Sequence, residues 1–99
     1  MTDESKLDHA VARAVRAEAL LADELLAEAF SGLEASYTAA WRATTIDEAG
    51  AREKLFLAVN IVGKVRDHLT AILANGKLAE DELKELAQVS ERRKRFGIL

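Results

Sequence analysis

Apolar side chains recur every three or four positions along most of the chain, and no proline interrupts them. This spacing places the apolar side chains on one face of an α-helix, and that face leaves water by packing against another helix. Ala, Leu, Glu, Lys and Arg dominate the composition and favour helix, whereas aromatic residues make up only 5%. A chain of 99 residues has room for one domain. We therefore predict an all-α fold in a single domain, residues 1–99.

Two boundaries divide the apolar pattern. At the first, the Thr45 hydroxyl and the Glu48 carboxylate have the spacing of a capping box, which starts a helix. At the second, Gly76 follows Asn75, and glycine readily takes the left-handed conformation that ends a helix. The boundaries predict a long antiparallel helical hairpin with a shorter third, C-terminal helix. The predicted helices span about 5–43, 46–74 and 79–96.

The first predicted helix is longer than the second, about 58 Å against about 44 Å at 1.5 Å per residue. Ser31 and Gly32 are its one soft point, where we expect a slight bend or a break. Its overhanging part carries an apolar stripe, and an exposed stripe of this length indicates a partner. We predict a homo-oligomer or a helical protein partner. The residues expected to carry the contact energy are Leu20, Leu21, Leu25, Phe30, Tyr37 and Trp41.

The three aromatic residues of that set have a second interpretation. Phe30, Tyr37 and Trp41 lie at helical spacing near the predicted connection. Aromatic residues in such places more often form the hairpin's own interior than a surface for a partner. The sequence leaves both interpretations open.

No residue pattern indicates catalysis or metal binding. The chain has no cysteine, and neither His9 nor His68 has a partner at the spacing of a metal-ligand pair. The stretch around Gly76 resembles half of an EF-hand loop, but Ala71 and Leu73 occupy positions where calcium needs oxygen ligands. We predict a protein that is not an enzyme and that binds no cofactor and no metal.

The densest positive run is the one feature that favours nucleic acid. The formal net charge is −3, so the chain as a whole does not attract phosphates. A helix-turn-helix interpretation around Gly76 is disfavoured, because Glu80, Asp81 and Glu82 stand where base-reading residues would lie. The run is also typical of a solvated helix end, since cations complement the helix dipole there. The candidate contact residues are Arg92, Arg93, Lys94 and Arg95.

The location is predicted from what the sequence lacks. No run of about 18 apolar residues occurs, so we expect no membrane span. The first six residues include no apolar run, so we also expect no secretory signal. These observations favour a cytoplasmic protein.

Four segments within residues 41–97 resemble small helical proteins encoded in tailed-phage and prophage gene clusters. They are helix faces, a cap and a turn, and they carry no catalytic or binding motif. The resemblance implies a phage or prophage origin and, for a phage protein, a virion-associated location. The segments are Trp41–Thr44, Arg52–Val59, Val65–Leu69 and Asn75–Leu78.

The leading hypothesis is a non-enzymatic helical interaction or structural protein that acts through its apolar helix face. The alternative is a nucleic-acid-associated accessory protein that uses the basic run at 92–95. A third hypothesis rests on residues 1–43, which carry eight acidic and four basic side chains. An acidic helix of this kind could imitate nucleic acid and inhibit a host protein.

Overall fold

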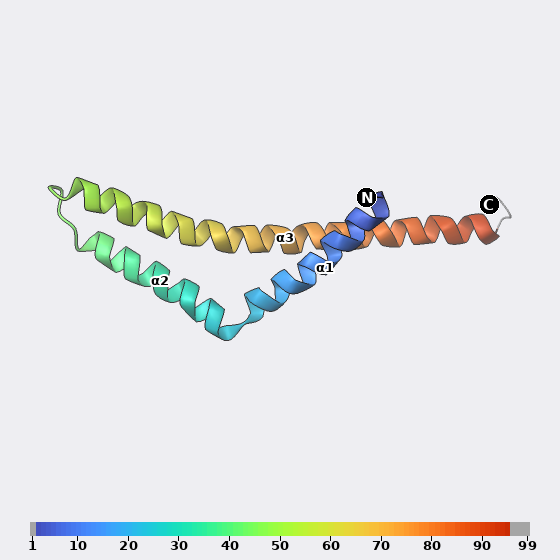
Figure 1. Cartoon of the computed structure of the whole chain (residues 1–99), viewed down its shortest axis with the longest axis horizontal. Coiled ribbons are helices and arrows are strands. Elements are labelled where there is room, and N and C mark those ends of the chain that lie inside the picture. The colour runs from blue at the N-terminus through green and yellow to red at the C-terminus, as the bar shows by residue number, and fades with distance from the viewer. Residues whose placement is uncertain (1, 96–99) are drawn as a thin grey trace. The chain divides into compact units, whose positions relative to one another are not determined.

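The computed structural model describes residues 2–95, and it describes their side chains as far as Lys94. It contains three α-helices, α1 (Asp3–Ala22), α2 (Glu24–Arg42) and α3 (Ala49–Arg95), and Figure 1 shows them in chain order. Residues 2–95 include no strand. The all-helical class predicted from the apolar spacing is confirmed.

The predicted helix boundaries are wrong at two places. The expected helix over 5–43 is two helices that meet at Asp23, and Ser31 and Gly32 lie inside an unbroken α2. The expected helices over 46–74 and 79–96 are one helix, α3, of 47 residues. A shorter third helix at the C-terminal end is therefore not observed within residues 2–95. Phe96, the last residue of that expected helix, lies outside the described residues.

Asp23 ends α1 and starts α2 because its side chain caps the second helix. Its backbone is extended, with φ −69° and ψ 119°, and its carboxylate accepts a hydrogen bond of 2.8 Å from the N–H of Leu26. A carboxylate in this position satisfies one of the amide groups that have no partner in the first turn. Glu24 follows in that turn, where the helix dipole favours negative charge.

The connection between α2 and α3 contains the predicted capping pair, but α3 begins at Ala49 and not at about residue 46. The Glu48 carboxylate accepts hydrogen bonds of 3.1 Å from both the N–H and the hydroxyl of Thr45. The backbone N–H of Glu48 donates to the Thr45 carbonyl at 3.0 Å, which closes a turn just before α3 begins. This arrangement is half of a capping box, because the Thr45 hydroxyl donates to Glu48 instead of accepting from its amide.

The contacts of the chain form two compact units. Among the described residues, the terminal unit contains 2–18 and 71–95, so it holds most of α1 and the second half of α3. The central unit is Ala19–Thr70 and holds the end of α1, all of α2 and the first half of α3.

Small residues hold the terminal unit together. Ala14 and Ala17 of α1 and Ala79 of α3 are buried, and so is Gly76. A Cβ atom added to Gly76 would overlap the Ala14 side chain and would lie 2.9 Å from the carbonyl oxygen of Ala10. The glycine therefore allows α1 and α3 to approach closely. The prediction that Gly76 ends a helix is wrong. Gly76 lies inside α3, where the lack of a side chain permits close packing and does not form a turn.

The central unit is held by a face of half-buried side chains. Within residues 19–70 every side chain keeps some exposure to solvent. The contact between α2 and α3 is therefore a single layer of side chains with no enclosed interior. The larger half-buried apolar and aromatic residues are Leu26, Phe30, Tyr37 and Trp41 on α2, and Leu55, Val59, Val62 and Leu69 on α3.

Candidate interaction surface

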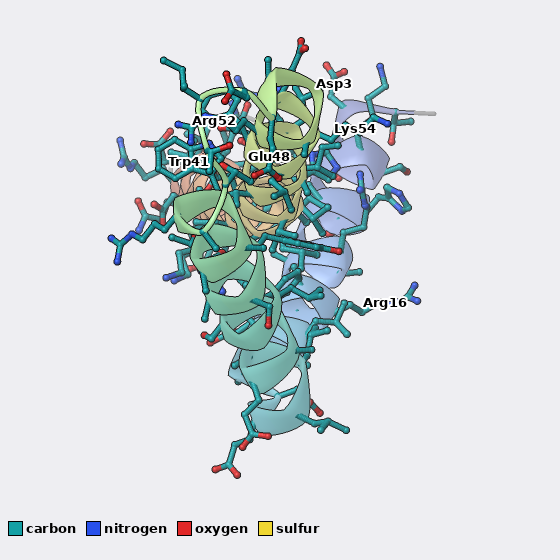
Figure 2. The ribbon with its side chains drawn as sticks, turned by 90° about the vertical axis from the view of Figure 1, so that its left-hand side faces the viewer. Asp3, Arg16, Trp41, Glu48, Arg52 and Lys54 are labelled. Atoms are coloured by element: carbon teal, nitrogen blue, oxygen red, sulfur yellow. The ribbon has the colours of Figure 1, made fainter. Side chains whose placement is uncertain are left out.

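The first link between α2 and α3 joins an arginine to a tryptophan. The Arg52 guanidinium lies over the Trp41 ring, 4.7 Å from its centroid, and Figure 2 shows the two side chains together beside the connection. Arg52 also donates to the Thr44 hydroxyl at 2.9 Å, and that hydroxyl donates to the Trp41 carbonyl at 2.6 Å. Cation, ring and hydroxyl together fix the start of α3 against the end of α2.

A second link repeats this chemistry farther from the connection. The Arg66 guanidinium lies 5.2 Å from the centroid of the Phe30 ring and forms an ion pair of 3.0 Å with Glu34. Both charged side chains are partly exposed, so water screens the ion pair and it contributes little by itself. The two links show that α2 and the first half of α3 run antiparallel within the central unit.

A small apolar hollow lies beside the first link. It is lined by Thr38, Trp41, Phe56 and Val59 and has a volume of about 190 Å³. No charged side chain lines it. This volume accommodates one large apolar side chain, which makes the hollow more typical of a docking contact than of a substrate site.

The six residues predicted to contact a partner divide into two groups. Leu20 and Leu25 are exposed, and 76% of Leu25 is accessible to solvent. Leu21, Phe30, Tyr37 and Trp41 are half-buried, and the Phe30 and Trp41 rings already contact arginines of α3. The structure therefore gives these two rings a role inside the central unit, while a role of the six in partner binding stays a prediction.

Sequence reasoning missed the most regular exposed apolar row, which lies on α3. Leu57, Ile61 and Val65 are four residues apart and are 51%, 60% and 47% exposed. Lys54, Lys64 and His68 lie among them, and all three are exposed. We call these six residues the α3 outer face. The spacing of four was visible in the sequence, but it did not show that the opposite face of α3 would contact α2.

The basic run lies at the end of α3. Arg92, Arg93 and Lys94 are exposed in its last turns, and the side chain of Arg95 lies outside those described. The placement agrees equally with a solvated helix end and with a contact to phosphates. The nucleic-acid alternative therefore stays a prediction.

No group of three or more His, Cys, Asp or Glu side chains is placed to hold a metal ion in the part of the chain that the structure describes. His9 and His68 are both exposed. Within the same residues, no helix is long and apolar enough to cross a lipid bilayer.

The chain matches no family model, no curated protein and no solved structure. Inferences about its function therefore rest on its own residues.

Proposed function

We propose that this chain is a non-enzymatic interaction protein that associates through exposed apolar helix faces, with further copies of itself or with a partner helix. The observation that carries this proposal is the lack of a closed interior. Among the described residues, the buried apolar side chains are three alanines, and no large side chain is fully buried. A domain normally removes its large apolar side chains from water, so these helices are suited to completing an interior by association.

The exposed apolar side chains within the central unit support the proposal. Leu57, Ile61 and Val65 of α3 are 51%, 60% and 47% exposed, and Leu25 of α2 is 76% exposed. Exposed apolar side chains that gather on a helix face are typical of a protein interface.

The phage or prophage origin belongs to the same proposal. Small helical proteins that act by assembly, without chemistry of their own, fit a role in a particle or in its construction. A compartment follows from the origin, cytoplasmic for an accessory protein and virion-associated for a structural one. The support is the sequence resemblance over residues 41–97.

An Ile61→Asp variant tests the proposal by measuring the assembly mass. Wild-type protein should sediment as a multiple of 10.8 kDa at high micromolar concentration. A charge placed at the middle of the α3 outer face must be buried or must break the contact. We expect the affinity to fall by about 30-fold or more, which is the loss usually caused by replacing a residue at the centre of an interface.

Asn60→Asp is the matched control, because it adds the same charge one residue away on α3. Asn60 is exposed, and its side chain donates only to the Phe56 carbonyl of its own helix, at 2.9 Å. Circular dichroism should show the same helical signal for both variants. A wild-type mass of 10.8 kDa throughout the concentration range contradicts association with copies of itself. Equal loss of mass in the two variants contradicts association through the α3 outer face.

A further inference from the structure

We propose that α1 is exchanged between two copies of the chain, so that the α1 of each copy packs on the second half of α3 in the other. Asp23, the single residue between α1 and α2, is the hinge of this exchange. The inference goes beyond the proposed function, because it uses the contact that holds the terminal unit and not the α3 outer face.

The contact to be exchanged is specific for the small side chains of α1. Ala14 lies where a side chain on Gly76 would be, and Ala17 is only 2% exposed. A helix with larger side chains at these two positions would not fit this part of α3, because the backbones approach too closely. The α1 of a second copy carries the same alanines. A second copy is therefore the partner that this face of α3 accepts.

The hinge lies in a stretch that favours continuous helix. Apart from Asp23, residues 19–27 are alanine, leucine and glutamate, with neither glycine nor proline. The Asp23 N–H donates to the Leu20 carbonyl at 3.2 Å, three residues back, whereas an unbroken α-helix bonds four residues back. The N–H groups of Glu24 and Leu25 open α2, where a helix offers them no acceptor, and an unbroken helix would supply one for each. Straightening the hinge therefore adds backbone hydrogen bonds.

The break at Asp23 also changes the direction of the packed face. The buried and half-buried row of α1 continues to Leu21, and further steps of three and four would reach Glu24 and Glu28, which are exposed. The half-buried row of α2 begins instead at Leu26, five residues after Leu21. Five residues turn an α-helix about 140° beyond one full turn. An unbroken helix would thus direct the α1 row away from the α3 that the α2 row covers.

A second copy receives the α1 row of such a straightened helix. Within the central unit, α2 diverges from the first half of α3 towards Asp23, as Figure 1 shows. A straight continuation would extend that divergence. Exchange of an identical element is a low-cost route to a dimer, and short hinges favour it. Because the exchange is reciprocal, a two-fold dimer pairs both α1 helices and both α3 faces.

Two variants that are each defective alone test the exchange. Ala14→Asp places a charge in the buried row of α1, and Gly76→Asp places one in the matching face of α3. Both also carry Ile61→Asp, which disrupts association through the α3 outer face. By sedimentation equilibrium each variant alone should have the mass of one chain, about 10.8 kDa. An equimolar mixture should dimerise at least ~10-fold more tightly than either variant, because one of its two exchanged contacts has no buried charge.

Two substitutions at the hinge should shift the exchange in opposite directions, again with Ile61→Asp present. Asp23→Ala removes the cap that starts α2 and favours the unbroken helix. Losing a cap costs the bent form about 5-fold at each hinge, so the dimer dissociation constant should fall about 25-fold. Glu24→Pro fixes the break, because proline suits the first position of a helix and Asp23 already has the extended backbone, φ −69° and ψ 119°, that a following proline requires. This variant should stay monomeric.

Glu28→Ala is the control for the hinge, because it removes an exposed acidic side chain of α2 and leaves the cap in place. It should not change the dissociation constant, and circular dichroism should show the same helical signal for all three hinge and control variants. Equal association of Asp23→Ala and Glu24→Pro overturns Asp23 as the hinge.

The mixture separates this inference from the proposed function. A mixture that dimerises no more tightly than its components overturns the exchange and leaves the association through apolar faces standing. A wild type that stays at 10.8 kDa overturns that association, while a mixture that still dimerises leaves the exchange standing.

Discussion

Replacing Gly76 with alanine should lower the free energy of unfolding by about 1–3 kcal/mol, the usual size of an overpacked contact. By helix propensity alone the same change should stabilise α3 by roughly 1 kcal/mol. The close approach of α1 decides the sign, because the new Cβ atom would overlap the Ala14 side chain and crowd the Ala10 carbonyl. Neither obstacle is the free end of a flexible side chain, so α1 must move away.

Gly63→Ala is the control, since Gly63 lies in the same helix and a Cβ atom there meets nothing within 4 Å. This variant should raise the free energy of unfolding by about 0.5–1 kcal/mol. Urea unfolding followed by circular dichroism measures both changes. Opposite signs support the close contact between α1 and α3. If both glycines gave the same gain in stability, the close approach at Gly76 would be disproved.

Trp41→Ala should cost about 2 kcal/mol of stability at low protein concentration, roughly half the loss for a fully buried tryptophan. The ring is half-buried, lies under the Arg52 guanidinium and forms one wall of the hollow beside Phe56. Because Trp41 is the single tryptophan, unfolding must be followed by circular dichroism and not by fluorescence. The loss should be accompanied by faster amide exchange at the end of α2.

Leu25→Ala serves as the comparison, because a side chain that is 76% exposed contributes little within one chain. Its stability at low concentration should change by no more than about 0.5 kcal/mol. In a double-mutant cycle, Arg52→Gln and Trp41→Ala should be coupled by about 0.5–1 kcal/mol. Equal losses for Leu25→Ala and Trp41→Ala, with no coupling to Arg52, would contradict the assignment of Trp41 to the contact between α2 and α3.

The all-helical class was predictable because it depends on local properties of the chain. Apolar spacing, the lack of proline and the abundance of strong helix formers all act over a few residues. The connection before α3 was predictable for the same reason, since Thr45 and Glu48 bond to each other across three residues. Local chemistry was sufficient at both places.

The helix breaks were missed where one residue type has two physical uses. An aspartate is as common on a solvated helix face as at a helix cap. At Asp23 only the extended backbone distinguishes the two. Gly76 fits a helix end and equally a close helix crossing, and only the position of Ala14 decides between them. Ser31 and Gly32 did not break α2, because one interior glycine costs less than the contacts that hold the helix.

The sequence did not single out the α3 outer face, because α3 has apolar side chains on two sides. Leu55 and Val59 contribute to the half-buried face towards α2, while Leu57 and Ile61 remain outside. A sequence with two apolar rows does not show which row contacts the neighbouring helix, since that choice depends on the partner. Leu20 and Leu25 are exposed, and their contact with a partner stays a prediction.

Thermal unfolding over a wide range of protein concentration tests the central claim, that these helices complete their interior by association. Followed by circular dichroism, the midpoint should rise by roughly 10 °C between about 5 μM and about 500 μM, because binding between copies stabilises only the folded chains. A midpoint that stays constant over this hundredfold range, with full helical signal at the lowest concentration, would show that one chain is stable alone and would contradict the account.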